Sequence, residues 1–364
     1  MKQFGATLYY FGREIHDKTH LPVGLILSAV GGQRIEPFIP REGFENTSEL
    51  MDTAFNIAVL QKRKGQYTEA AMDKFDQIAA WVEAARQARA EKKQAPQFPA
   101  LYAWGDPQPP HRATMLFNPN ICPLIPFGIR GVVWYQGEGN EFEQESYAIK
   151  MRALVNGWRQ CWKRPELPFY FAQIASAGPA GAADDRPEGW AGIGYQKVRM
   201  GQLQSLRAIP HSGMAVSLDI GGGDLHPKNK QDLARRLSLW ALKNEYGIKE
   251  IVPSGPLFRA MRIEGEKARI SFDYAETGLM AGEKTGLLPV REVPDGGLKG
   301  FAIAGEDQKW HWAKAVIEGG EVVVSSPDVL RPTAVRYAFT MNPEGCNLYN
   351  KAGLPASPFR TDEW

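Results

Sequence analysis

The chain of 364 residues is too long for one small domain, and its length favours two domains. A hydrophobic fraction of 43% and a charged fraction of 23% are ordinary for a globular protein, which at this size buries a large core without disulfide or metal staples. The net charge of +2 is too small to attract nucleic acid or a membrane surface, and no apolar run reaches the length of a membrane span.

The three cysteines, Cys122, Cys161 and Cys346, show no CxxC pairing. They therefore indicate neither a zinc site nor a dense disulfide framework, although their number allows one disulfide bridge. Cysteine usage does not reveal the compartment, and the first residues lack the apolar stretch of a signal peptide.

The first residues resemble a helix that is already under way. Phe4, Leu8 and Phe11 recur at helical spacing, and no capping signal precedes them. We take this as a hint that sequence upstream of the chain is absent.

The first two thirds of the chain alternate between strand-like and helix-like segments. Short apolar runs predict strands at Pro22–Ala29, Ile129–Tyr135, Leu167–Ile174 and Gly213–Asp219. Longer stretches with one apolar face predict helices at Tyr67–Lys93, Phe142–Trp162 and Asp232–Tyr246. Strands that alternate with helices predict a parallel α/β sheet with helices on both faces.

The pattern of apolar and polar residues changes after Tyr246. Met261–Tyr274 and Trp310–Ser326 alternate apolar and polar residues around Glu-Gly and Gly-Gly turns, which is antiparallel β patterning. We therefore predict an α/β domain over residues 1–248 and a smaller β-rich domain over residues 249–364.

The strongest local signal is Asp224-Leu225-His226-Pro227, which follows a predicted strand. Open α/β sheets bind ligands at the carboxyl ends of their strands. A histidine with a nearby aspartate can act as a general base that the carboxylate orients. A solvated turn histidine is an equal alternative on spacing alone.

A second signal, Trp134–Asn140, directly follows another predicted strand. The side chains of Gln136 and Asn140 can donate to an oxyanion, and Glu138 can orient a base. The structural alternative is a helix start that Asn140 caps, and both can hold together.

A third signal is Ser28-Ala29-Val30-Gly31-Gly32-Gln33, where the glycine pair allows a ligand to approach backbone N–H groups. Ser28 lacks the G-x-S-x-G turn that exposes a nucleophile, so we expect it to be a buried, hydrogen-bonded residue.

Two weaker patterns carry no function. His16 and His20 have the spacing of a helical zinc pair, but the glutamate of that motif is missing and Pro22 follows closely. Gly221–Gly223 opens no helix with a G-x-G-x-x-G pattern. We predict neither a metal nor another cofactor.

Four long segments resemble the sialate O-acetylesterase family, in the order typical of it: PVGLILSAVGGQRIEPF, LFNPNICPLIPFGIRGVVWYQGEGN, DIGGGDLHPKNKQDLARRL and NLYNKAGLPASPFRTDEW. The resemblance implies an SGNH hydrolase with a flavodoxin-like three-layer α/β/α domain beside β-sandwich material. It also implies metal-free hydrolysis of O-acetyl groups on sialic acids, or on plant polysaccharides in bacterial relatives. Members are often periplasmic or secreted.

The resemblance also implies roles for single residues. His226 takes the place of the catalytic base and Asp224 that of its orienting partner. Asp219 lies close in the sequence and is the alternative partner, although we expect it to be structural. The Gly32 N–H and the Gln136 side chain take the place of oxyanion donors, and Glu138 and Asn140 support that turn.

The chain departs from the family at the nucleophile. Its GDS-like or GQSNM-like serine motif does not occur in the 364 residues. We expect the first strand and its serine to lie upstream and the chain alone to have negligible esterase activity. An inactive carbohydrate-binding relative and an enzyme that uses Ser28 are the alternatives.

Overall fold

The computed structural model describes residues 4–62, 64–97, 110–141, 143–177, 194–222, 226–294 and 296–364. Its helices are α1 (Ala6–Thr19), α2 (Arg41–Glu45), α3 (Met51–Lys62), α4 (Lys64–Ala90), α5 (Glu145–Cys161), α6 (Tyr195–Ala208) and α7 (Lys230–Asn244). The strands of the first sheet are β1 (Val132–Trp134), β2 (Phe169–Ala172) and β3 (Ser212–Ala215), which pair in parallel in the order β1-β2-β3.

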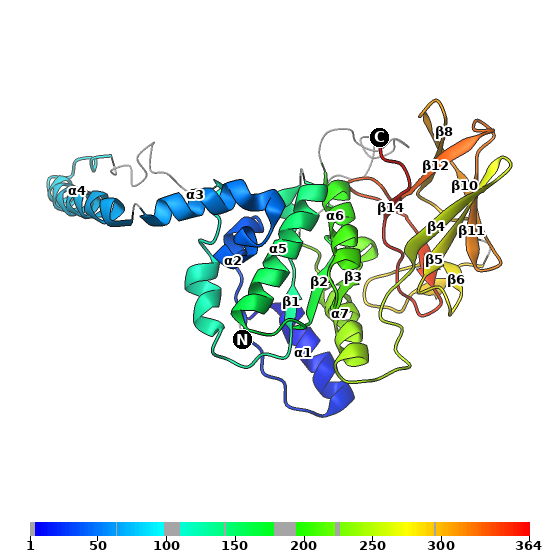
Figure 1. Ribbon diagram of the computed structural model, residues 1–364, viewed down its shortest axis with the longest axis horizontal. Coiled ribbons are helices and arrows are strands. Elements are labelled where there is room, and N and C mark those ends of the chain that lie inside the picture. Colours follow the sequence, from blue (N-terminus) through cyan, green and yellow to red (C-terminus); the bar gives the residue numbers. More distant parts are fainter. Residues whose placement is uncertain are drawn as a thin grey trace.

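Alternating side chains divide this sheet into two faces. Phe169 and Phe171 of β2 join a core cluster that contains residues of α5 and α6, whereas Tyr170 and Ala172 join residues of α1 and α7. The chain places large apolar groups at both odd and even positions because β2 is buried on both faces. The result is a three-layer α/β/α arrangement, which confirms the predicted fold class (Figure 1).

The later strands form three antiparallel sheets. Their bounds are β4 (Leu257–Glu264), β5 (Lys267–Asp273), β6 (Leu279–Glu283), β7 (Arg291–Glu292), β8 (Phe301–Gly305), β9 (Trp310–Trp312), β10 (Lys314–Glu318), β11 (Glu321–Ser325), β12 (Pro332–Tyr337), β13 (Leu348–Asn350) and β14 (Phe359–Arg360). The strand orders are β10-β11-β5-β4, β14-β12-β8-β9 and β13-β6-β7. They lie beside α6 and α7, so the predicted change from α/β to antiparallel β is present (Figure 1). The boundary at residue 248 stays a prediction.

Buried polar contacts join these sheets to the α/β layers. The Arg199 guanidinium on α6 donates to the carbonyl oxygens of Thr340 and Met341, both at 2.8 Å. The Gln173 amide after β2 donates to the Ser357 hydroxyl at 3.0 Å. Arg199 and Gln173 are fully buried, so both contacts are shielded from water.

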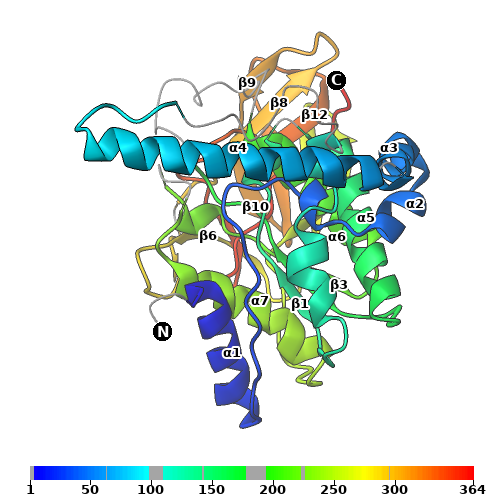
Figure 2. The same cartoon turned by 90° about the vertical axis from the view of Figure 1, so that its left-hand side faces the viewer.

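The predicted strand Pro22–Ala29 is wrong. Residues 20–30 form no strand, and Ile26, Leu27 and Val30 are each more than 40% exposed. A strand needs a neighbour for its backbone hydrogen bonds, and none of the described segments pairs with this one. The segment runs from the end of α1 past the sheet toward α3 (Figure 2).

β1 is an edge strand of the three-stranded sheet, and its Val132 and Val133 are only half-buried. α3 and α4 extend away from the α/β layers (Figures 1 and 2). Sequence reasoning missed α2, α3 and α6. It had predicted α1, α5, α7 and most of α4.

Candidate active site

The carboxyl end of β1 leads into a tight turn that carries three predicted site residues. Gln136 follows the strand, and Glu138 and Asn140 lie in the 3-10 helix η6 (Glu138–Asn140). This is the edge of a parallel sheet at which α/β proteins bind ligands. That these residues take part in a site stays a prediction.

Asn140 connects this turn to the segment before α2. Its carbonyl oxygen accepts hydrogen bonds from the Ile35 backbone N–H at 3.0 Å and from the Gln136 side chain at 2.9 Å. Its amide nitrogen donates to Glu36 at 3.3 Å. The capping alternative is wrong, because α5 begins after Gln144 and the fully buried Asn140 turns inward.

Gln136 is held from several sides. Its amide nitrogen also donates to the Gln33 carbonyl oxygen at 3.0 Å, and the Tyr147 hydroxyl lies 3.2 Å from its amide oxygen. Gln202 donates to the Gln136 backbone oxygen at 3.2 Å. Both N–H groups of the Gln136 amide therefore have acceptors within the protein, namely Gln33 and Asn140. Its role as an oxyanion donor stays a prediction.

Gly32 lies in an exposed turn with φ +69°, a conformation that favours glycine. Gly139, in η6, allows this loop to pack closely against the turn. A Cβ atom on residue 139 would lie only 2.7 Å from the Gln33 carbonyl oxygen. Two glycines thus place the Gly32 backbone and the Gln136 side chain on neighbouring segments. Ser28, on the same loop, is half-buried and makes no hydrogen bond to another described residue, so its expected burial was wrong.

Sequence reasoning missed four charged residues beneath this turn, Arg34, Glu36, Glu143 and Lys150, which we call the ion cluster. Lys150 lies 2.8 Å from Glu36 and 2.5 Å from Glu143. Arg34 lies 2.9 Å from Glu36 and also pairs with Glu143. Burial alone would raise the pKa of Glu36, but hydrogen bonds from Arg34 and Lys150 and the Lys150 charge outweigh burial and lower it to about 2.

The sequence feature that could have revealed the ion cluster is the presence of charged residues within apolar segments. Glu36 stands in the run RIEPF, and Lys150 interrupts the apolar face of a helix. Buried charges are rare unless they are paired, so such positions indicate partners elsewhere in the fold.

Glu138 lies in a different environment from Glu36. Burial raises the pKa of its carboxyl group, while a backbone hydrogen bond and the positive charges of Lys230, His226 and Arg199 oppose that rise. The fold therefore brings His226 close enough to Glu138 for their charges to interact. Lys230 also contacts the Tyr135 hydroxyl at 3.2 Å.

His226 itself is exposed and immediately precedes a buried proline. Its predicted partner Asp224 lies outside the described residues, so that pairing stays a prediction. Asp219 forms two hydrogen bonds with the Arg236 guanidinium at 2.6 and 2.7 Å and accepts one from Tyr349 at 3.2 Å. This buried pairing agrees with the expected structural role of Asp219.

Within the described part of the chain, no group of histidine, cysteine and acidic residues has the arrangement of a metal site. His16 instead contacts the Leu21 carbonyl oxygen at 2.8 Å, and His20 ends α1 in a left-handed conformation. Cys122, Cys161 and Cys346 are free. None of the described helices is both long enough and apolar enough to cross a membrane.

Comparison with known proteins first defines the class. Residues 119–226 match the family described as "Carbohydrate esterase, sialic acid-specific acetylesterase". A crystal structure of a novel carbohydrate acetylesterase from Xanthomonas citri is similar at a TM-score of 0.71 and 31% identity, and the match covers 100% of this chain and 66% of that one. The class to which both comparisons point is that of the carbohydrate esterases.

Curated relatives narrow this class to a family. Sialate O-acetylesterase from Rattus norvegicus is 25% identical over 378 residues, which is 97% of this chain and 63% of the relative. The Homo sapiens protein of the same name is 24% identical over 382 residues, which is 98% and 61%. Over 97–98% of its length the chain is similar to sialate O-acetylesterases, which confirms the resemblance read from the sequence. It spans less than two thirds of the length of these relatives.

Proposed function

We propose that the protein takes part in hydrolysis of O-acetyl esters on sialic acid or another acetylated sugar by a Ser-His-Asp mechanism. The observation that supports this proposal is the contact between the loop that carries Gly32 and the Gln136–Asn140 turn at the carboxyl end of β1, together with the position of His226 in the segment after β3. The electrostatic effect of His226 on Glu138 supports their proximity. The family of the chain supports the ester as the bond that is cleaved.

In this mechanism, His226 takes the proton from a serine hydroxyl as the serine oxygen attacks the acetyl carbonyl carbon. Asp224 orients the imidazole ring. The Gly32 N–H and the Gln136 amide stabilise the oxyanion, which requires one Gln136 N–H to leave its present acceptor, Gln33 or Asn140. His226 then returns its proton to the sugar oxygen, and water releases acetate from the serine.

The nucleophile is the incomplete part of the site. None of the serines in the 364 residues stands in a GDS-like or GQS-like motif. We propose that the serine is supplied by sequence outside this chain. Without it, the remaining groups have no hydroxyl to activate, and only residual catalysis is expected.

The test is hydrolysis of p-nitrophenyl acetate by the 364-residue chain. A longer version from the same gene is measured beside it wherever an in-frame Gly-Asp-Ser or Gly-Gln-Ser lies upstream of Met1. The short chain should stay near the buffer rate and the long one should be active. In the long version, His226→Ala should lower kcat/KM about 10³-fold or more.

His311→Ala, in strand β9, is the matched histidine control and should keep full activity. Comparable activity in the short and long forms would contradict an external nucleophile, and Ser28→Ala would then be the next variant. Inactivity of both forms toward acetyl esters, with retained sugar binding, would favour the alternative of an inactive carbohydrate-binding relative.

A further inference from the structure

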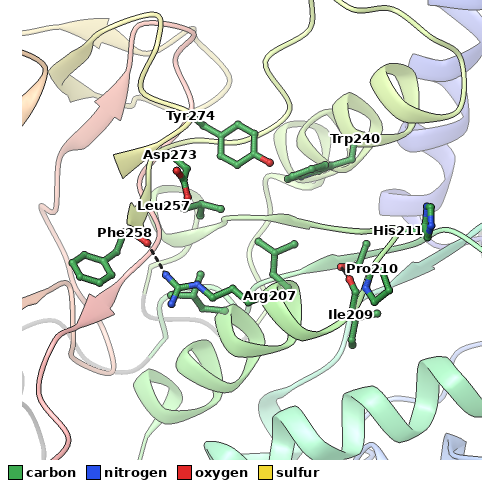
Figure 3. Close-up of a pocket in the computed structure, with 12 residues that line it drawn as sticks. Arg207, Ile209, Pro210, His211, Trp240, Leu257, Phe258, Asp273 and Tyr274 are labelled. Atoms are coloured by element: carbon green, nitrogen blue, oxygen red, sulfur yellow. Dashed lines mark hydrogen bonds between the residues drawn. The ribbon is translucent and has the colours of Figure 1, made fainter. Parts of the chain in front are cut away.

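A cavity of about 300 Å³ lies at the end of the parallel sheet opposite the candidate active site. It sits where β3 begins, between α6, α7 and the strands β4 and β5 (Figure 3). Ser212, the first residue of β3, and His211 before it line the cavity. Gln136 and His226 of the proposed catalytic site follow the carboxyl ends of β1 and β3, so this cavity is separate from that site.

Two aromatic rings form part of its wall. Trp240 of α7 and Tyr274, which follows β5, meet edge to face with their ring centroids 5.7 Å apart. The buried indole is fixed, because its N–H donates to the Met214 carbonyl oxygen at 3.0 Å and its ring lies directly against Gly213. Figure 3 shows the Tyr274 hydroxyl pointing toward Trp240 across the hollow.

Two residues of this wall have unusual backbones. His211 has φ +52° and Tyr274 has φ +59°, in the left-handed region that a bulky side chain rarely adopts. Buried Asn350 holds the Tyr274 carbonyl oxygen at 2.9 Å and thereby fixes the strained residue. Non-glycine residues in such conformations cluster at ligand sites, where surrounding contacts maintain them.

Polar groups of both signs complete the lining. The Arg207 guanidinium donates to the Phe258 carbonyl oxygen at 2.6 Å, which fixes its position beside the cavity. Neither the Asp273 carboxylate nor the Tyr274 hydroxyl is hydrogen-bonded to another described residue. The cavity thus offers donors and acceptors together, and the opposite charges of Arg207 and Asp273 select against a strongly ionic ligand.

We propose that this cavity binds one neutral pyranose ring. A pyranose has an apolar C–H face that packs on aromatic rings such as Tyr274, and hydroxyl groups that both donate and accept hydrogen bonds. The volume is at the lower end of small-molecule pockets, which suits a single sugar ring. This site would hold a saccharide chain at a place remote from ester cleavage, and it does not depend on the proposed hydrolysis.

The probes are methyl β-D-glucopyranoside and methyl β-D-galactopyranoside at millimolar concentration, measured by saturation-transfer NMR on the native chain. Binding of at least one glycoside is expected. Tyr274→Phe removes the hydroxyl and Asp273→Asn replaces the charged carboxylate, a strong acceptor, with a neutral amide, so the double variant should raise the dissociation constant at least fivefold. The paired control, Tyr9→Phe with Glu266→Gln, changes the same chemistry at exposed positions and should leave it unchanged.

Absence of saturation transfer to either glycoside would overturn the proposal. So would an unchanged dissociation constant in the Tyr274→Phe/Asp273→Asn protein. A signal that His226→Ala abolishes and the cavity variants retain would place the sugar at the candidate active site instead. Because the readout is binding, its outcome is separate from the esterase assay.

Discussion

Two glutamates lie on neighbouring segments at one edge of the sheet, and the fold treats them in opposite ways. Glu36 is 2% exposed, yet Arg34 and Lys150 lower its pKa to about 2. Glu138 is half-buried, and burial raises its pKa in spite of Lys230 and His226. Direct hydrogen-bonded cations keep the first carboxylate ionised, whereas the cations near the second do not fully offset its burial.

This contrast distinguishes the ion cluster, which supports the site, from Glu138, whose protonation can change. The ion cluster fixes the backbone between the Gly32 loop and α2, and Asn140 connects it to Gln136. Glu138 interacts electrostatically with His226 and Lys230, so an altered charge on Glu138 would affect the proposed base. The following substitutions test either the ion cluster and the segments next to it, or Glu138.

The largest effect is expected for Glu36→Ala, because it leaves the buried Lys150 and the half-buried Arg34 with Glu143 as their shared acidic partner. Breaking a buried ion pair costs about 3–5 kcal/mol of unfolding free energy. Urea unfolding measures the loss. The control is Glu45→Ala, which removes an exposed partner of Arg41 and should cost below about 0.5 kcal/mol. Equal losses in the two variants would contradict a supporting role for the cluster.

The pH dependence tests the same carboxylate. The ordinary pKa of Glu36 is 4.5 and its folded value is about 2, so its contribution is complete above 4.5 and is lost as the pH falls toward 2. By linkage, this contribution is about 3 kcal/mol. Glu36→Gln should therefore show a flatter decline in stability between pH 5 and 2 than the native chain. Parallel curves for the two proteins would refute the lowered pKa.

Gly139→Ala tests the contact between the two segments that carry Gly32 and Gln136. The new Cβ atom would meet the Gln33 carbonyl oxygen at 2.7 Å, and a backbone atom cannot move away freely. Overpacking of this kind costs about 1–3 kcal/mol. Thermal unfolding compares it with Gly24→Ala, where no atom lies within 4 Å. A Gly139→Ala protein as stable as Gly24→Ala would show that the segments are not in tight contact.

The smallest effect is expected for Glu138→Gln. Because its folded pKa is raised, the glutamate is most favourable below its ordinary pKa, and this contribution is lost as the pH rises through the folded value. The neutral glutamine should therefore raise the melting temperature slightly at pH 7 and leave it unchanged near pH 4. Glu266→Gln, at an exposed turn, should have no effect at either pH. Destabilisation at pH 7 would mean that the charged form of Glu138 is the favoured one.

Sequence periodicity sufficed wherever burial repeats along an element. The apolar runs around Val132, Phe169 and Gly213 became parallel strands, and the amphipathic stretches on either side became α5 and α7. The motif positions also placed Gln136, Glu138 and Asn140 directly after β1. Short-range patterns report these features because they depend on which faces of an element are buried.

Long-range partners were decided only in the tertiary structure. The run from Pro22 to Ala29 has the composition of a buried strand, but a strand exists only with a neighbour to accept its hydrogen bonds, and the described chain provides none. Likewise, Lys150, which lies 114 residues away in the sequence, helps Arg34 to lower the pKa of Glu36, whereas burial in the folded protein raises the pKa of Glu138. Local sequence by itself determined the elements and the residues at their ends, while the contacts between distant segments determined what those residues experience.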